Sequence, residues 1–180
     1  MKPSARYLIV FALTLAAAPL HSQATPVADG DHAVSTVRSV WQPIATYITQ
    51  SAEEMPAEKY SYRPTPDVRT FGQLIGHVAG SQYMFCAAAT GDSVRKEDDI
   101  EKSRTTKDEL VAALKASTEY CAKAYAQGDA ATRAEITMFG QKHNRLWALM
   151  SNAAHDDEHY GNIVTYFRLN GMVPPSSRGQ

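Results

Sequence analysis

The chain of 180 residues is long enough for one domain with a substantial core and too short for two domains of ordinary size. Its formal net charge of −1 gives no electrostatic reason to expect a nucleic acid or an anionic membrane as a partner. We therefore expect a soluble mature protein whose partner is a small molecule, with no nucleic-acid or membrane partner.

The N-terminal residues 1–24 have the features of a secretory signal peptide. Lys2 and Arg6 precede an apolar run over residues 7–18 that is too short for a membrane span, and Ser22-Gln23-Ala24 fits the small-x-small cleavage rule. We expect cleavage after the last of these residues, followed by periplasmic or secreted localisation, with residues 25–30 as a flexible segment. An uncleaved anchor is the alternative.

Two cysteines, Cys86 and Cys121, bear on the same question. In an oxidising compartment they can form a disulfide, whereas a cytosolic pair usually stays reduced. Two buried thiols that pack as small hydrophobic side chains, or a reactive thiol near a metal, are the other interpretations. The sequence alone leaves all three open.

The first predicted helix covers residues 31–54 and is marked by apolar side chains at helical spacing. These are Val34, Val37, Trp41, Ile44 and Ile48. Three prolines, Pro56, Pro64 and Pro66, then hold residues 56–69 out of helix, because proline lacks an amide donor and restricts the residue before it. This segment is predicted to be a connector.

The second predicted helix begins at a capping box formed by Thr70 and Gln73 and runs over residues 71–91. The third begins at the same signature in residues 106–109 and is expected to stop at Gly128. Both helices are amphipathic, which predicts that each buries one face against a neighbour.

The remaining segments are less regular. Residues 93–104 are charged and aperiodic, which predicts a solvated loop, and residues 136–139 suit either a short extended piece or an irregular crossing. The fourth helix is expected from about Lys142 to Asn170, with Gly171 as its stop.

Four amphipathic helices without a convincing strand pattern predict an all-α fold, a four-helix bundle. We place this domain at residues 31–175, with a C-terminal tail at 176–180. Metal sites in such bundles are built from side chains of facing helices, so the histidines of the predicted helices are of interest.

Three histidines are the candidate metal ligands. His155 and His159 lie four residues apart on the fourth predicted helix, so both imidazoles project from one face and can hold one metal ion. Zinc-type sites usually have at least three protein ligands, and His77 on the second predicted helix is the best candidate for the third. The alternative is that these imidazoles are hydrogen-bonded core residues without an ion.

No catalytic residue is assigned from the sequence. Asp156 or Glu158 would suit the orientation of a ligand imidazole, as carboxylates commonly do, but the expected place of both is the solvent-exposed surface. Asn152 and Tyr166 share the histidine face, where ordinary bundle packing explains them equally well.

Several stretches, in this order along nearly the whole mature chain, resemble the DinB-like family. They are residues 60–66, YSYRPTP; 71–79, FGQLIGHVA; 155–162, HDDEHYGN; and 166–175, YFRLNGMVPP. The resemblance implies a four-helix bundle, frequently a homodimer, in which His77, His155 and His159 would bind a divalent metal, zinc or nickel. Asn162 departs from the family pattern, since many members carry the longer glutamine there.

Three neutral imidazoles would leave such an ion its full positive charge. If water takes the open coordination position of the metal, the expected activity is hydrolysis. If a thiolate takes it, the expected activity is thiol transfer. Export counts against the thiol version, because cytosolic thiol cofactors are less assured outside the membrane. The alternative is a metal- or ligand-binding bundle without turnover, which predicts a closed site with a fourth protein ligand.

Overall fold

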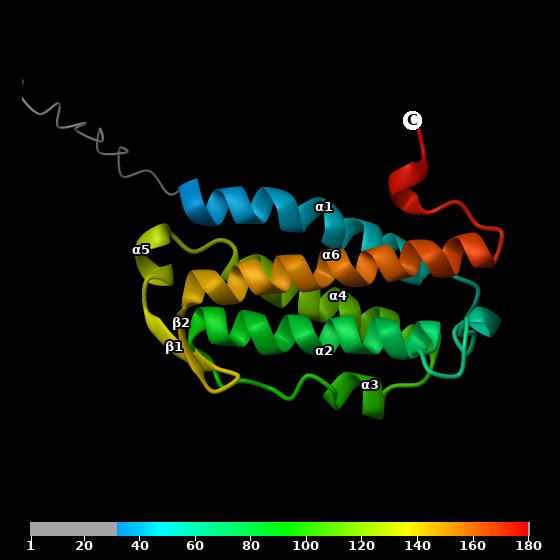
Figure 1. Cartoon of the computed structure of the whole chain (residues 1–180), viewed down its shortest axis with the longest axis horizontal. Helices are drawn as coiled ribbons and strands as arrows, with labels where there is room; N and C mark the ends of the chain where they lie inside the picture. The colour runs from blue at the N-terminus through cyan, green and yellow to red at the C-terminus, as the bar shows by residue number, and fades with distance from the viewer. Residues whose placement is uncertain (1–31, 180) are drawn as a thin grey trace, which may run out of the picture. The chain divides into compact units, whose positions relative to one another are not determined.

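Four long helices lie side by side in the computed structural model, which describes residues 32–179 (Figure 1). They are α1 (His32–Glu54), α2 (Phe71–Thr90), α4 (Lys107–Ala124) and α6 (Arg145–Leu169). Helix α2 packs against α4 and α6, and α1 packs against α6 and α4. The predicted all-α four-helix bundle is confirmed, while the predicted leader at 1–24 and the segment at 25–30 lie outside the described residues.

Short elements join these helices. Two of them are one-turn 3-10 helices. Helix η1 (Ala57–Lys59) lies in the proline-rich connector, and η2 (Pro175–Ser177) lies near the C-terminus. Within residues 32–179, no helix has both the length and the apolar character that crossing a membrane requires.

Both predicted capping boxes are present. The side chains of Thr70 and Gln73 each accept a hydrogen bond from the other residue's backbone amide, and Thr106 and Glu109 do the same at the start of α4. Gly91 follows α2 with a φ of 84°, the left-handed conformation that favours glycine at a helix end. The local signals that began and ended the second predicted helix therefore act as expected.

The third long helix ends before its predicted stop. Helix α4 ends at Ala124, and Gly128 instead precedes the short helix α5 (Asp129–Thr132). The reason is Gln127, whose side-chain amide donates to the backbone carbonyls of Ala124 and Ala89. The amide thus provides a donor for a backbone carbonyl at the end of α4 and links this end to α2, so the helix need not continue to the glycine.

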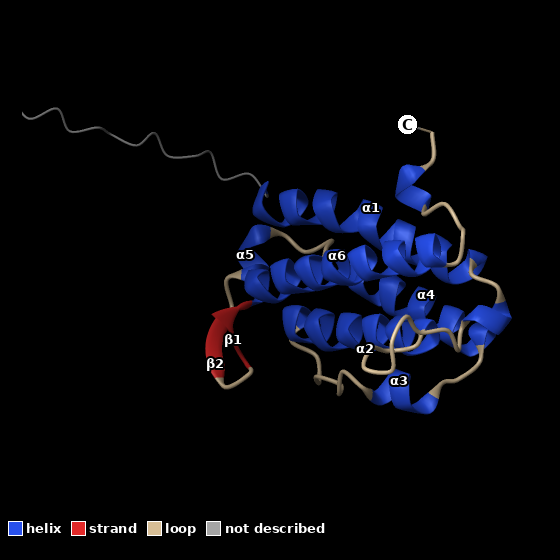
Figure 2. Ribbon diagram, turned by 45° about the vertical axis from the view of Figure 1, so that its right-hand side comes forward, coloured by secondary structure: helices blue, strands red, loops and turns tan. Residues whose placement is uncertain are grey.

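A hairpin precedes the last helix, where the fourth helix was expected to have begun (Figure 2). Strand β1 (Glu135–Met138) pairs antiparallel with β2 (Gln141–Asn144), so the extended interpretation of residues 136–139 is confirmed and a helix start at Lys142 is wrong. Phe139 and Gly140 both have positive φ, as the two-residue turn of a tight hairpin requires. Asn144 caps α6 by accepting from the Trp147 amide at 2.9 Å.

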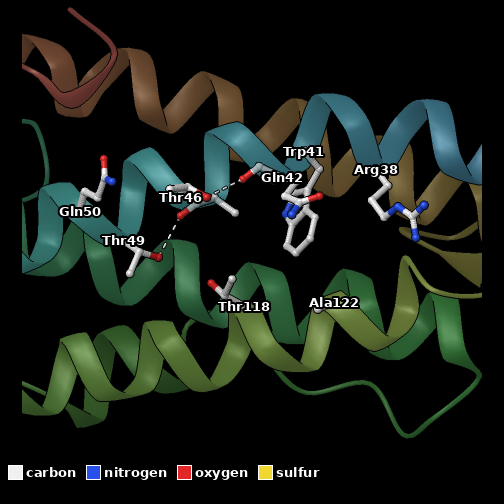
Figure 3. A pocket seen from close by; sticks show the side chains of 9 residues that line it. Arg38, Trp41, Gln42, Thr46, Thr49, Gln50, Thr118 and Ala122 are labelled. Carbon is white, nitrogen blue, oxygen red and sulfur yellow. Dashed lines mark hydrogen bonds between the residues drawn. The ribbon is translucent and has the colours of Figure 1, made fainter. Parts of the chain in front are cut away.

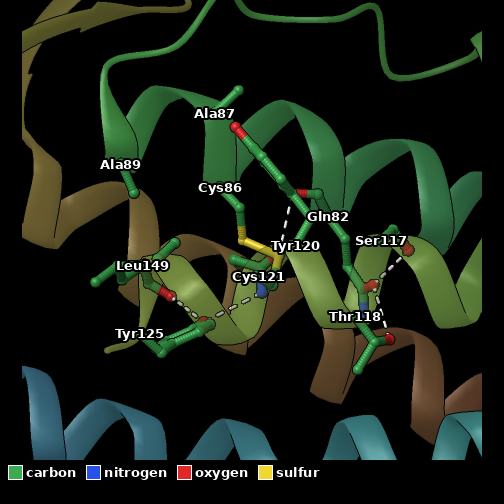
Figure 4. Close-up of a disulfide and its surroundings, with 12 residues drawn as sticks. Gln82, Cys86, Ala87, Ala89, Ser117, Thr118, Tyr120, Cys121, Tyr125 and Leu149 are labelled. Carbon is green, nitrogen blue, oxygen red and sulfur yellow. Dashed lines mark hydrogen bonds between the residues drawn. A yellow bond between two sulfur atoms is a disulfide. The ribbon is translucent and has the colours of Figure 1, made fainter. Parts of the chain in front are cut away.

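A disulfide joins Cys86 on α2 to Cys121 on α4, with 5.3 Å between the Cα atoms (Figure 4). Both residues are completely buried. Of the three interpretations of this pair, the structure selects the disulfide, and neither cysteine of the chain is a free thiol.

The solvated loop predicted at residues 93–104 is confirmed in part, since most of these residues are exposed and none is buried. They include helix α3 (Asp99–Ser103) and lie along α2, where two glycines leave room for the backbone. A Cβ atom at Gly76 would lie 2.8 Å from the Glu101 Cα, and one at Gly80 would lie 1.8 Å from the Glu97 carbonyl oxygen. The absence of these two side chains therefore allows the segment to cover α2.

Candidate metal centre

The imidazoles of His77, His155 and His159 converge on one point between α2 and α6. The Nε2 atom of His155 lies 3.2 Å from that of His77 and 3.1 Å from that of His159. The candidate ligand atoms of all three residues lie within 4.8 Å of one another. The structure thus brings together the three histidines that the sequence analysis selected.

Three nitrogen atoms so close together are poorly satisfied by hydrogen bonds alone. A neutral imidazole has one N–H donor and one lone pair, and the single Nε2 of His155 faces both other rings. A cation at the centre would use all three lone pairs. Zinc to nitrogen bonds of about 2.0–2.1 Å in a tetrahedral site place ligand nitrogens about 3.3 Å apart, close to the separations seen here. The residues present fit a divalent metal ion.

Burial keeps the three imidazoles neutral. It is the main cause that lowers the pKa of each of His77, His155 and His159 to about 4. The positive charge of Arg69 also lowers the pKa of His77. Repulsion between protonated rings adds to the lowering, from His159 at His77 and from His77 at His155. Because a metal ion binds the unprotonated nitrogen, this environment favours the ligand form of the rings at neutral pH.

Glu97 brings a carboxylate to the same point, and no sequence pattern singled it out. Its Oε1 atom lies 3.7 Å from His77 Nε2 and 3.6 Å from His155 Nε2. The Ser81 hydroxyl on α2 donates to this oxygen at 2.7 Å. The only available signal was indirect, namely two helical glycines four residues apart beside His77, which mark a place where another backbone approaches closely.

Outer contacts reach the remaining ring nitrogens of two histidines. Glu101 Oε2 lies 3.7 Å from His77 Nδ1, and the Glu101 carboxylate accepts from Arg69 Nε at 3.1 and 3.2 Å. Asn162 Nδ2 lies 3.3 Å from His159 Nδ1, so the shorter amide at this position reaches the ring. Such contacts fix ring orientation in metal sites.

The expected surface position of Asp156 is wrong. Its side chain is completely buried, and its Oδ2 atom accepts from Trp41 Nε1 at 3.0 Å and from Gln82 Nε2 at 2.9 Å. The reason is that this face of α6 packs against α1 and α2 rather than against solvent. Asp156 therefore joins helices in the core and does not orient an imidazole, whereas Glu158 is exposed as expected.

One groove of the bundle is separate from the histidines. It has a volume of about 580 Å³ and lies between α1 and α4, with Trp41, Thr46 and Thr118 among its lining residues (Figure 3). None of the three histidines lines it. The convergence of ligand atoms, rather than the size of a cavity, therefore marks the candidate site.

Comparison with known families matches the model of the DinB superfamily to residues 45–163. The chain belongs to the DinB superfamily. The matched range includes His77, His155 and His159. Among curated proteins no match to this chain is found.

Solved structures of DinB-like proteins share the fold. A DinB-like protein of Bacillus cereus has a TM-score of 0.65 and 16% sequence identity, over 78% of this chain and 95% of that one. A DinB-like protein of Bacillus subtilis has a TM-score of 0.64 and 21% identity, over 81% and 99% of the two chains. A mutant of a mycothiol-dependent maleylpyruvate isomerase also matches, with a TM-score of 0.59 and 13% identity, over 74% of this chain and 65% of the isomerase.

Proposed function

We propose that this DinB-superfamily protein is an exported enzyme that holds a divalent metal ion, zinc or nickel, through His77, His155 and His159 and acts on a small molecule. The observation that carries the proposal is the convergence of three neutral, largely buried imidazoles on one point. When bound, a divalent metal acts as a Lewis acid that lowers the pKa of a water or a thiol and so supplies a nucleophile at neutral pH.

The residues around the histidines prepare the ligand set. Burial by α2 and α6 keeps the rings unprotonated, and Asn162 beside His159 Nδ1 holds that ring's orientation. The Glu101 carboxylate, paired with Arg69, lies 3.7 Å from His77 Nδ1 and faces that nitrogen. These contacts would hold the Nε2 atoms toward the ion without rearrangement, which is what a preorganised site requires.

Hydrolysis is the first reaction class we propose, with metal-activated water as the nucleophile. Thiol transfer is the second, and one observation favours it: a fold neighbour is named as a mycothiol-dependent isomerase. That neighbour shares 13% identity, so it supports only that this fold accommodates thiol-dependent chemistry in another protein.

Two features support export. Residues 1–24 carry the signal-peptide pattern, and the bundle contains a fully buried disulfide, a bond that persists in oxidising compartments. Cytosolic thiol cofactors are less assured there, which ranks the hydrolase above the thiol transferase.

The test is the metal content and activity of protein purified without an affinity tag. Wild type should carry close to one zinc or nickel per chain, and His77→Ala, His155→Ala and His159→Ala should each lose it. His143→Ala is the matched control, because the His143 ring lies in β2, stacks on Trp147 and does not belong to the converging group of His77, His155 and His159. Wild type with a stoichiometry far below one that added zinc or nickel does not restore would contradict the metal site.

A screen of ester, amide and thiol-transfer substrates then separates enzyme from binder. The proposal expects turnover by wild type and by His143→Ala, and its loss in His159→Ala. Equal rates in all three proteins would remove the catalytic claim and leave the alternative, a metal- or ligand-binding bundle without turnover.

A further inference from the structure

The Glu97 carboxylate occupies the place where a fourth ligand would be expected. Its Oε1 atom is almost equally distant from two ligand nitrogens, 3.7 Å from His77 Nε2 and 3.6 Å from His155 Nε2. In a tetrahedral site with bonds of about 2.0–2.2 Å, nitrogen and oxygen ligands lie about 3.3–3.5 Å from one another. The observed separations exceed that range by only a few tenths of an ångström.

We propose that Glu97 is the fourth protein ligand of the metal ion, so that the resting site has three histidines and one carboxylate. This inference rests on the metal site of the proposed function. It adds a ligand from the segment that joins α2 to α4, outside the two helices that carry the histidines. Glu97 then occupies the position that hydrolysis requires for water, so a water or a substrate group that binds the metal has to displace the carboxylate. A carboxylate that stays bound would make the site the closed one expected of the alternative without turnover.

The backbone of Glu97 is held in place by a close contact with α2. The Glu97 carbonyl oxygen would be 1.8 Å from a Cβ atom at Gly80, so only glycine permits this approach. Gly76, one turn earlier, admits the Glu101 backbone in the same way. The carboxylate is therefore presented by a segment fitted against the helix rather than by a freely moving loop.

The side chain is also oriented. The Ser81 hydroxyl, completely buried on α2, donates to Glu97 Oε1 at 2.7 Å. This is the same oxygen that faces the two Nε2 atoms. A carboxylate that ligates a metal is itself usually hydrogen-bonded, and Ser81 provides that contact.

Charge gives a second reason for the inward position. The Glu97 carboxylate lies within 4 Å of two of the Nε2 atoms, those of His77 and His155, and the nearby cation Arg69 is engaged by Glu101. Among residues 32–179, no Lys or Arg side chain forms an ion pair with this carboxylate. A divalent ion at the centre supplies a cationic partner, and the carboxylate in turn neutralises one of its two charges.

The experiment measures zinc affinity by competition with a chromophoric chelator. Glu97→Gln should bind zinc more weakly than wild type by a factor above about 10, and Ser81→Ala, which removes only the hydrogen bond to the carboxylate, should weaken binding by a smaller factor. Asp98→Asn is the matched control: it removes the same charge from the adjacent residue, which pairs with Lys102 instead. This control should keep wild-type affinity.

Cobalt substitution gives a readout that does not depend on activity. Wild type loaded with Co²⁺ should show the intense visible absorption of a four-coordinate site and should not respond to millimolar azide. Glu97→Ala should change this spectrum and respond to azide, because the anion enters the position that the carboxylate has left. Circular dichroism and thermal unfolding check that each variant is folded.

The outcomes separate the two proposals. Wild-type affinity and an unchanged Co²⁺ spectrum in both Glu97 variants, with metal lost in His155→Ala, would overturn the fourth ligand and leave the three-histidine site intact. Failure of wild type to bind any metal would overturn the proposed function, and this inference with it.

Discussion

Trp41 on α1 donates its indole N–H to the buried carboxylate of Asp156 on α6, at 3.0 Å. The Gln82 side chain on α2 donates to the same oxygen at 2.9 Å, and its Oε1 atom accepts from the Ser117 hydroxyl on α4 at 2.7 Å. One connected group of polar side chains therefore joins all four long helices inside the core. Burial raises the pKa of Asp156 to about 7.

Asp156→Ala is expected to lower the free energy of unfolding by about 2–4 kcal/mol, because two buried donors lose their acceptor. Urea unfolding followed by circular dichroism measures this loss. Asp157→Ala is the control, since it removes an exposed carboxylate from the next position and should change stability by less than about 0.5 kcal/mol. A loss below about 1 kcal/mol in Asp156→Ala would show that the network contributes little.

Gly80→Ala is expected to displace the segment that carries Glu97, because the new Cβ atom would lie 1.8 Å from the Glu97 carbonyl oxygen. The predicted loss of stability is about 1–3 kcal/mol, together with weaker zinc binding. Gly161→Ala is the matched control: it also lies in a long helix, and nothing lies within 4 Å of its Cβ position. There alanine should stabilise by up to about 1 kcal/mol through helix propensity. Equal effects of the two substitutions would contradict the close-approach explanation.

Removal of the disulfide by the double substitution Cys86→Ala and Cys121→Ala should lower the free energy of unfolding by about 3–4 kcal/mol. The bridge joins residues 35 apart in sequence, and opening it returns that loop's freedom to the unfolded chain. Guanidinium unfolding of the oxidised wild type and of the double variant gives the difference. Wild type kept reduced with dithiothreitol should resemble the variant, whereas a double variant as stable as the oxidised protein would refute the prediction.

The start of α1 should show a pH-dependent contribution to stability. The Asp129 carboxylate accepts from the backbone amides of Ala33 and Val34 at 3.0 and 2.9 Å, and these bonds lower its pKa. The pKa of Asp129 is lower in the folded protein than in the unfolded chain, where it is about 3.9. The stabilisation is therefore present at pH values above the unfolded-state pKa and is lost as the pH falls through the folded-state pKa.

Melting temperatures of wild type and Asp129→Ala measured from pH 7 to pH 2.5 test this. The difference between them should stay constant near neutral pH and shrink below about pH 4 as the carboxylate is protonated. Asp67→Ala, which removes an exposed carboxylate from the connector, should show no such trend. A difference that grows on acidification would contradict the sign of the effect.

The long helices were predictable because their signals are local. Apolar spacing and the capping boxes at Thr70 and Thr106 act within a few residues, and the structure has both boxes in place. The convergence of the three histidines was predictable for a related reason: a four-residue spacing on one helix needs only one partner from a facing helix.

The features that the sequence did not predict have a different origin, since most of them depend on contacts between distant segments. The charge of residues 93–104 predicted solvent exposure, which most of them have, but the close approach of Glu97 and Glu101 to glycines on α2 is a contact between distant segments, so Glu97 was overlooked. The charge of Asp156 likewise predicted the surface, whereas donors from two other helices stabilise it inside. Strand β1 alternates, with Ile136 and Met138 packed toward the core, but β2 contains no apolar residue and is largely exposed, which left β2 unrecognised.

The cross-links of the bundle are unevenly distributed. The disulfide fastens α2 to α4, and an ion held by His77, His155 and His159 would fasten α2 to α6. Of the four long helices within residues 32–179, α1 takes part in neither link, and the groove of Figure 3 runs along its border with α4. Amide hydrogen exchange should therefore be fastest in α1 among these helices, with local unfolding beginning at the N-terminal end of the bundle and reaching α2 last.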